Sequence, residues 1–226
     1  MPNKKRKNLN VEFFKHWSSS MAYVLGFFAA DGNLAINPNG YHYIEFNSCD
    51  RESIETIRKA LDSNHKIARR KRDPKWKTSF RIQISSGPVF KDLIKLGMKL
   101  RKSNDLKFPT IPNNYVGDFV RGYFDGDGHV HLGQYWRKDR NKWHWVFGSG
   151  FTSGSKDFLL GLWNVLKKHV SGGCLYKKIR GYELNFSRQD SLALFKLMYD
   201  NTSPDMFLKR KYDIFLKAFK TLNMGA

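Results

Sequence analysis

The stretch Gly26-Phe27-Phe28-Ala29-Ala30-Asp31-Gly32 recurs 96 residues later as Gly122-Tyr123-Phe124-Asp125-Gly126-Asp127-Gly128. In each copy, two small residues lie four positions apart and would share one face of a helix. Such stripes let helix backbones approach closely, and glycine inside a helix costs ~1 kcal/mol relative to alanine. We therefore predict two apolar helices whose small-residue stripes pack against each other. Gly32 and Gly128 should end them in the left-handed conformation that favours glycine.

A second internal match lies outside these helices. Phe80-Arg81-Ile82-Gln83-Ile84-Ser85 matches Tyr182-Glu183-Leu184-Asn185-Phe186-Ser187 at an offset of 102, and both alternate as half-buried strands do. The chain therefore contains two diverged copies of one α/β (α+β) unit with the element order αββαββα. We assign the copies to residues 1–104 and 105–226, with a proline-containing linker over about 101–114.

The remaining elements follow from the same periodicities. Strand pairs are expected at 33–37 with 41–48 and at 129–134 with 143–153, amphipathic helices at 51–61 and 156–170, and apolar helical stretches after the repeated strands at 89–98 and 191–199.

Charge and composition narrow the classes of function. Of the 226 residues, 40 are Lys or Arg and 20 are Asp or Glu, a net charge of +20, of which +12 falls in residues 1–104 and +8 in 105–226. Such an excess points to a polyanion contacted by both halves. The hydrophobic fraction of 41% is too high for a disordered basic tail. The chain is thus a folded basic protein.

The sequence shows no pattern typical of a membrane span, a secretory signal or a cysteine metal site. The longest run without Lys, Arg, Asp or Glu is 15 residues, 16–30, against the ~20 that a membrane-spanning helix needs. No apolar segment follows the basic cluster 4–7, so we expect a flexible arm near phosphate, or else a nuclear signal, but no secretory signal. The two cysteines show no metal-binding spacing. We expect an intracellular protein, in the cytoplasm or an organelle of its host.

Asp31 and Asp127 are the candidate catalytic residues. If the two stripes pack, both carboxylates emerge at negative helix ends, where the macrodipole favours a cation. Mg²⁺ binds carboxylate and carbonyl oxygens, and the carbonyls of Ala30 and Gly126 are available beside them. The alternative is that each Asp merely precedes a turn glycine. Repetition of the whole pattern favours a metal site for phosphodiester hydrolysis.

These two segments, from Val24 and Val120 onward, resemble the LAGLIDADG motif of homing endonucleases, and the surrounding αββαββα repeats extend the resemblance over nearly the whole chain. Two motifs in one polypeptide are similar to the single-chain, pseudo-symmetric type. The resemblance implies that Asp31 and Asp127 are metal-binding catalytic acids, one for each DNA strand. It also implies a saddle of two antiparallel sheets in the major groove of a long, imperfectly palindromic site, with the motif helices at the interface.

The resemblance further implies a magnesium-dependent hydrolase that makes a double-strand break with short 3′ overhangs. We expect Mn²⁺ to substitute and Ca²⁺ to support binding without cleavage, and we expect a monomer that needs no protein partner or membrane. Ala29 replaces the first Asp of the motif, whereas Asp125 keeps it and is expected to be structural. Because the chain does not begin with Cys or Ser or end with His-Asn, a free-standing or intron-encoded enzyme is expected.

The family places a basic residue near each metal site. Lys107 and Lys209 are the candidates, each following an apolar residue near a closing segment, and Lys102 and Lys211 compete with them. Any of these could stabilise charge on the scissile phosphate. The pattern Asp127-x-His129-x-His131 permits chelation, but base or phosphate contact is the favoured interpretation because the first repeat has no counterpart.

Strand alternation and basic turns predict the DNA-facing residues. Strand positions that read base edges or turn cations that contact phosphate are Asn33, Asn37, Tyr43, Glu45, Asn47, Arg70, Arg72, Lys75, Lys77, Ser79, Arg81, Gln83, His129, His131, Gln134, Arg137, Lys138, Arg140, Lys142, Lys178, Arg180, Glu183, Asn185 and Ser187.

Two alternatives use the same fold. An RNA maturase that assists intron splicing would be equally basic, although it need not retain both acidic residues. A nuclease-inactive DNA-binding regulator would usually carry an added recognition module, and the two repeats leave few residues for one.

Overall fold

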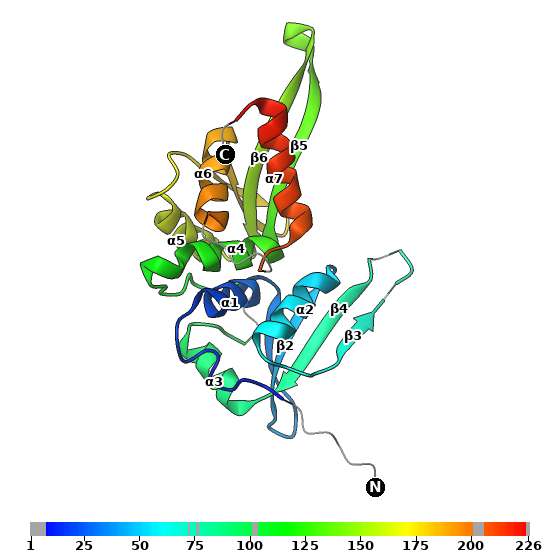
Figure 1. Cartoon of the computed structure of the whole chain (residues 1–226), viewed down its shortest axis with the longest axis vertical. Coiled ribbons are helices and arrows are strands. Elements are labelled where there is room, and N and C mark those ends of the chain that lie inside the picture. Colours follow the sequence, from blue (N-terminus) through cyan, green and yellow to red (C-terminus); the bar gives the residue numbers. More distant parts are fainter. Residues whose placement is uncertain (1–7, 72, 76, 101–103, 201–205, 225–226) are drawn as a thin grey trace. The chain divides into compact units, whose positions relative to one another are not determined.

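A computed structural model describes residues 8–71, 73–75, 77–100, 104–200 and 206–224. The described residues form two compact units, one drawn from residues 1–102 and 109–126 and the other from 103–108 and 127–226. Each contains a four-stranded antiparallel sheet with helices on one face (Figure 1). None of the helices in the described residues has the length and apolar character needed to cross a bilayer.

The first unit follows the predicted element order. Its elements are α1 (Ser19–Asp31), β1 (Gly32–Ile36), β2 (His42–Ser48), α2 (Arg51–Ala60), β3 (Ile67–Arg70), β4 (Ser79–Ser85) and α3 (Gly87–Lys95), followed by a 3₁₀ turn (Asn113–Tyr115) and most of α4 (Val116–Asp127). The strand order is β1-β2-β4-β3. Ile44, Phe46, Ile82 and Ile84 are buried beneath the helices, while the alternate positions form the open face.

The second unit repeats the pattern and adds a helix. It contains β5 (Gly128–Arg137), a 3₁₀ turn (Lys138–Arg140), β6 (Lys142–Ser153), α5 (Lys156–Leu166), β7 (Cys174–Lys178), β8 (Gly181–Phe186), α6 (Arg188–Tyr199) and α7 (Lys209–Leu222). The strand order β5-β6-β8-β7 matches that of the first sheet. Helix α7 lies along β5 and β6 (Figure 1), where Phe147 packs edge-on against Phe215 and Phe219.

The small-residue stripes of α1 and α4 pack as predicted. A methyl group on Gly26 would overlap the carbonyl oxygen of Phe119 and lie 2.9 Å from Tyr123 N. A methyl group on Gly122 would overlap the carbonyl oxygen of Tyr23. Each glycine therefore lies directly against the backbone of the other helix, which no residue with a Cβ could do at this separation.

The prediction that Gly32 and Gly128 adopt the left-handed conformation is wrong. Gly32 is extended, with φ −84° and ψ 160°, and begins β1; Gly128 begins β5 and has no positive φ. Both helices pass directly into a strand, so no reversal of the backbone is needed. Glycine is required at position 32 because a methyl group there would overlap the ring of Phe28.

The segment between the repeats is divided between the two units. In the second unit, Ser155 Oγ donates to the carbonyl of Leu106 at 2.6 Å, and the rings of Phe108 and Phe158 lie 5.6 Å apart. From Pro109 onward the chain belongs to the first unit. The 104/105 boundary between the repeats remains a prediction from the sequence, and α4, which is assigned to the second repeat, packs largely in the first unit.

Candidate catalytic and DNA-binding site

The two motif helices are fixed at their beginnings by different interactions. Ser18 caps α1, since its side chain accepts a hydrogen bond from Met21 N at 3.1 Å. In the first turn of α4, Asp118 accepts from Arg121 at 2.6 Å, and the two residues are only 8% and 2% exposed. A buried, hydrogen-bonded ion pair at this position fixes the start of the helix that ends at Asp127.

Asp31 and Asp127 are the last residues of α1 and α4, and both are half-buried. The Asp31 Oδ2 atom lies 3.3 Å from the place where a Gly126 methyl group would stand, so a side chain there would crowd the carboxylate. In the second unit, Thr152 Oγ1 donates to the Asp127 carbonyl at 3.0 Å. The helix macrodipoles direct negative charge at both carboxylates, which favours a bound cation.

The donor set around these helix ends fits a hard cation. The described residues contain no cluster of three or more His, Cys, Asp or Glu side chains that could hold a metal ion. An ion bound by Asp31 or Asp127 would therefore complete its coordination with backbone carbonyls, water and substrate oxygens. Mg²⁺ commonly binds in this way, through one or two carboxylates and retained waters.

Asp125 occupies a different environment from Asp127. It is 3% exposed, and its Oδ2 accepts a hydrogen bond from the Tyr23 hydroxyl at 2.8 Å. The Arg121 guanidinium lies 5.5 Å from the centre of the Tyr23 ring. These contacts join α1 to α4 and support the structural role expected for Asp125.

The candidate lysines differ sharply in burial. Lys107 and Lys209 are exposed, and Lys209 lies 3.3 Å from Asp213 on the same helix. Lys211 is 4% exposed, and its Nζ donates to the carbonyl of Gly128 at 2.6 Å. It thus places a buried cation one residue from Asp127, whereas Lys102 lies outside the described residues.

The open face of the first sheet carries a connected polar network. Glu45 accepts hydrogen bonds from Arg81 Nη1 at 3.0 Å and Gln83 Nε2 at 2.6 Å, while Asn33 Nδ2 lies 3.5 Å away. The register pairs Asn33 with Glu45 and Glu45 with Gln83, and pairs Asn47 with Arg81. The structure thus brings these predicted residues together, with the carboxylate at the centre.

The other predicted residues of the first unit lie around this network. Tyr43 pairs with Ser85 near one end of the face, and the Asn37 side chain accepts from Tyr41 N at 2.8 Å to close the β1–β2 turn. Among the turn residues of the first sheet, Arg70, Lys75 and Lys77 are exposed and Ser79 is half-buried, while Arg72 lies outside the described residues.

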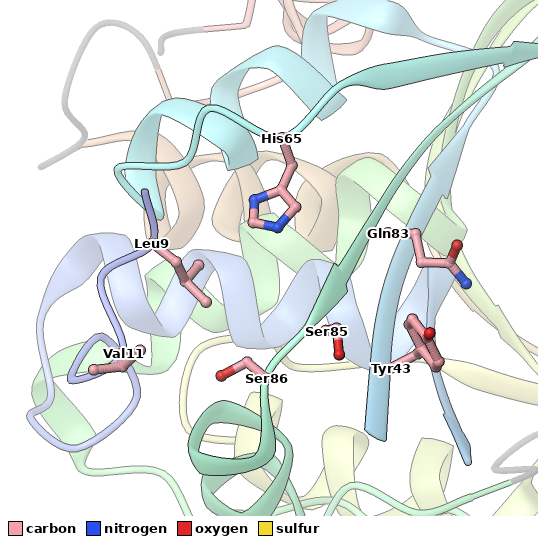
Figure 2. Close-up of a pocket in the computed structure, with 7 residues that line it drawn as sticks. All are labelled: Leu9, Val11, Tyr43, His65, Gln83, Ser85 and Ser86. Atoms are coloured by element: carbon pink, nitrogen blue, oxygen red, sulfur yellow. The ribbon is translucent and has the colours of Figure 1, made fainter. Parts of the chain in front are cut away.

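A cavity of about 460 Å³ hollows one end of this face (Figure 2). Tyr43, Gln83 and Ser85 line it from the sheet, and Leu9 and Val11 line it from the N-terminal segment. The ring of His65 points toward this space, with its Nδ1 2.8 Å from Ser63 Oγ. The face thus combines a polar network at its centre with a recess at its end.

The second sheet has its own carboxylate-centred network. Glu183 lies 2.6 Å from Lys178 and 3.4 Å from His129 Nε2. A methyl group on Gly150 would overlap Asn185 Oδ1 and lie 2.7 Å from His129 Cε1. His129, Glu183 and Asn185 therefore gather on one face as predicted, and glycine leaves room for them.

The surroundings of two residues on this face, His129 and Glu183, lower their pKa values. Burial is the main effect on His129 and lowers its pKa below the usual 6.5, with Lys211 and Lys178 contributing in the same direction. Burial alone would raise the pKa of Glu183, but hydrogen bonds from Lys178 and Asn185 and the charges of His129 and Lys178 outweigh it. The pKa of Glu183 is therefore below its usual 4.5. The carboxylate stays ionised, and its charge offsets that of Lys178.

The remaining predicted residues occupy the edges and the hairpin. Gln134 pairs with Trp145 and lies on the opposite face of β5 from His129 and His131, which differs from the predicted phase. Ser187 is exposed, and its hydroxyl donates to Asp190 at 2.9 Å. Arg137, Lys138, Arg140 and Lys142 are exposed at the β5–β6 turn.

A shallow cavity of about 280 Å³ adjoins Asp127 in the second unit. Lys178 and Arg180 line it together with Thr152 and Tyr182. Sequence reasoning missed Thr152, because a threonine in a strand carries no signal of a carbonyl partner 25 positions away. The site thus places two cations around one motif aspartate.

Comparisons with known proteins agree with this geometry. Residues 18–96 match the family described as "LAGLIDADG-like domain". A curated protein, the "Probable translation initiation factor IF-2" of Methanocaldococcus jannaschii, is 29% identical over 138 residues, which cover 54% of this chain. The chain spans only 11% of that protein's length.

Solved structures match over most of the chain. The homing endonuclease I-WcaI bound to its DNA recognition sequence is 18% identical, with a TM-score of 0.58 and 93% of each chain covered. The LAGLIDADG meganuclease I-AabMI bound to uncleaved DNA is 14% identical, with a TM-score of 0.60 and coverage of 89% of this chain and 90% of that chain. The meganuclease I-SmaMI bound to uncleavable DNA is 11% identical, with a TM-score of 0.59 and the same coverage.

Two αββαββα repeats in one chain, with glycine-striped helices ending at Asp-Gly, define a two-repeat α+β protein of the meganuclease fold. Residues 18–96, within the first repeat, are similar to the LAGLIDADG-like domain, and the chain as a whole has the fold of the LAGLIDADG homing endonucleases. The predictions of family resemblance and fold class are thereby confirmed.

Proposed function

We propose that this protein is a site-specific endonuclease that makes a double-strand break in a long, imperfectly palindromic DNA site by metal-dependent phosphodiester hydrolysis. The observation that carries the proposal is the pair of helices α1 and α4, packed backbone to backbone through Gly26 and Gly122 and each ending in an aspartate. If each aspartate merely preceded a turn glycine, the two helices would not need to approach each other this closely. Two acidic residues presented at helix ends suit the cleavage of two strands.

Asp31 and Asp127 would hold the metal, assisted by the carbonyls of Ala30 and Gly126. A bound Mg²⁺ would supply an activated water and neutralise charge on the reacting phosphate. The helix ends hold the carboxylates on packed backbone, which limits the reorganisation needed when charge develops. The close contact between Asp31 and Gly126 supports this role, because it keeps side-chain bulk away from the carboxylate.

Of the candidate catalytic lysines that the structure describes, Lys211 is the best placed to assist near Asp127. Its burial and its hydrogen bond to the Gly128 carbonyl hold the ammonium group in place. A positioned cation of this kind stabilises negative charge on a scissile phosphate more effectively than a mobile exposed one. Lys107 and Lys209, both exposed, are better suited to phosphate contact.

The two open faces would bind the DNA. Both carry hydrogen-bonding side chains that suit base edges, and exposed cations at their margins suit the phosphate backbone. The net charge of +20 supports a polyanionic partner. Because the first face carries Arg81 and Gln83 where the second carries Glu183 and Asn185, the two half-sites should differ in sequence.

The test begins with a cleavage selection on a duplex DNA library containing candidate insertion sites, run with Mg²⁺ and in parallel with Ca²⁺. We expect double-strand cutting with short 3′ overhangs in Mg²⁺, and binding without cutting in Ca²⁺. Asp31→Asn or Asp127→Asn should abolish double-strand cutting while leaving affinity for the selected site within about threefold, a difference below 1 kcal/mol. Asp105→Asn, a change at an exposed acidic residue, is the matched control.

The other outcomes separate the alternatives. Full double-strand cutting by either motif variant would refute the assigned mechanism. Sequence-specific binding with no cutting in any divalent metal would identify a regulator instead. Preference for folded intron RNA over every duplex in the library would identify a maturase.

A further inference from the structure

The β5–β6 hairpin extends well beyond the sheet to which it belongs. β6 pairs with β8 only over Ser149–Ser153, whereas β5 and β6 continue to pair as far as Arg137 and Lys142. The outer part is therefore a two-stranded ribbon, and Figure 1 shows it continuing past the end of α7. The corresponding hairpin of the first unit, within the described residues 32–48, is shorter, since β1 has 5 residues and β2 has 7.

The ribbon carries two exposed tryptophans on one face. Trp136 pairs with Trp143 across the strands, and their rings pack edge-on with centroids 5.7 Å apart. Trp136 is nevertheless 45% exposed and Trp143 62% exposed. Cross-strand packing helps a ribbon that would be marginal in isolation, but it does not account for leaving this much aromatic surface in water.

The tryptophans lie on the face opposite to the one proposed for duplex DNA. The register places Trp136 and Trp143 in the same phase as Gln134 and Trp145, and the alternate phase contains His129 and His131. Bases within a duplex stack on one another and offer no free ring faces. A nucleic acid that contacts these indoles would therefore have to offer unpaired bases.

The positive charge of the ribbon tip indicates which kind of partner the ribbon binds. Four exposed cations, Arg137, Lys138, Arg140 and Lys142, surround one exposed acidic residue, Asp139. The leading end of the ribbon is thus wholly polar, so it could not enter a bilayer, and the aromatic rings are on its flank. Aromatic rings beside a row of cations form the pattern that binds single-stranded nucleic acid, with bases stacking on rings and phosphates near the cations.

We propose that the ribbon face formed by Trp136 and Trp143 binds unpaired DNA that adjoins the duplex target. The choice of DNA rests on the proposed function, because a duplex bound on one face of the sheet would hold a contiguous unpaired flank at high effective concentration. Unpaired bases stack on the indoles, while the turn cations Lys138 and Arg140 contact their phosphates; Arg137 and Lys142 pair with each other on the alternate face of the ribbon. The protein would then favour target sites next to locally opened or gapped DNA.

The test is fluorescence anisotropy of a labelled mixed-sequence single-stranded DNA oligonucleotide, measured with the full chain in EDTA so that no cleavage occurs. The double variant Trp136→Thr/Trp143→Thr keeps β-branched residues in the strands. It should bind the oligonucleotide at least about 10-fold more weakly, since stacking on even one aromatic ring is worth about that factor. Trp136→Tyr/Trp143→Tyr retains both the packed pair and the stacking surface, and should remain within about threefold of the parent.

Tyr135→Thr is the matched control on the same ribbon. Tyr135 is 50% exposed but lies on the opposite face, where its hydroxyl is 2.8 Å from His131 Nε2. It should leave single-strand binding unchanged. Equal losses in the Thr double variant and Tyr135→Thr would refute the assignment of this face, as would full binding by the Thr double variant.

Further arms identify the partner and separate this inference from the proposed function. Tighter tryptophan-dependent binding of an RNA oligonucleotide of the same sequence would overturn the assignment to DNA, as would tryptophan-dependent binding of phosphatidylserine vesicles. A gapped duplex carrying the selected site should bind at least about 10-fold more tightly than the intact duplex, and the Thr double variant should lose this difference. Single-strand binding without duplex cleavage would refute only the nuclease; duplex cleavage with no effect of the tryptophans would refute only the ribbon site.

Discussion

Substituting alanine for Gly122 should separate the two motif helices. The added methyl group would overlap the carbonyl oxygen of Tyr23 and lie 2.8 Å from its carbonyl carbon and 3.0 Å from Phe27 N. All three atoms belong to the backbone of α1, so no side-chain rotation relieves the contact. Non-bonded carbon atoms prefer about 3.5–4.0 Å, and the helices must therefore move apart by about 1 Å.

Moving the two helices apart lowers the free energy of unfolding. A gap of 0.5–1 Å forfeits roughly a quarter to a half of each dispersion contact, and fully buried aromatic rings, among them Tyr23, Phe119 and Tyr123, pack beside this contact. Overpacking a core costs about 1–3 kcal/mol, and backbone contact places this site at the upper end. Helix propensity returns at most ~1 kcal/mol. We expect Gly122→Ala to lower the free energy of unfolding by about 2 kcal/mol or more.

Urea unfolding followed by circular dichroism measures this change. For a chain of this length the loss corresponds to a fall in Tm of about 4–8 °C. Gly87→Ala is the control, because the nearest atom to its added methyl group is 4.0 Å away, and it should change stability by less than about 0.5 kcal/mol. Unchanged stability in Gly122→Ala would show that the helices are not packed through this glycine.

Three further changes test other parts of the molecule. Asp118→Asn removes the carboxylate charge from the buried pair with Arg121 and should cost about 3 kcal/mol in urea unfolding; a loss below 1 kcal/mol would contradict the importance of this pair. Because the pKa of Glu183 is lower when folded, its contribution to stability is present above pH 4.5 and declines as pH falls. The unfolding free energy of Glu183→Gln, measured from pH 6 to 3, should therefore fall less steeply below pH 4.5 than that of the parent, and equal slopes would count against the network. Lys211→Met should reduce single-turnover cleavage at least about 10-fold with affinity for duplex DNA retained, as expected for one lost charge-stabilising group; Lys217→Met, at an exposed position of α7, is its control, and equal rates for the two variants would remove Lys211 from the mechanism.

Much of the fold was predictable because the chain contains two diverged copies of the same structural unit. The two Gly-x₃-small patterns gave the motif helices and their mutual packing, and strand alternation gave the buried faces of β4 and β8. Repetition made each weak local pattern more informative. The α7 helix was missed because it has no counterpart in the first repeat, although Phe215, Ala218 and Phe219 have helical spacing.

The errors have local causes. Gly32 is the first residue of β1, so the usual association of Asp-Gly with a left-handed helix end did not apply. Gln134 was grouped with His129 and His131, which would require a bend in the strand between positions 131 and 134. The pairing of β5 instead continues without interruption to Arg137, so the alternation places Gln134 on the other face. The position of Lys211 depends on where α7 folds back against β5. No spacing along the chain encodes such a long-range contact.

The contribution of α4 to the first unit bears on how the protein could be divided. A fragment ending at the sequence boundary, residue 104, would contain α1 without the helix that covers Gly26 and the aromatic rings beside it. Expressed alone, it would expose an apolar groove shaped to receive a second glycine-striped helix. The helix α1 of another copy is such a helix, so the isolated first repeat should associate with itself. A split protein made from the two repeats should therefore be produced by co-expression rather than by mixing purified halves, so that α4 covers α1 as the two pieces fold.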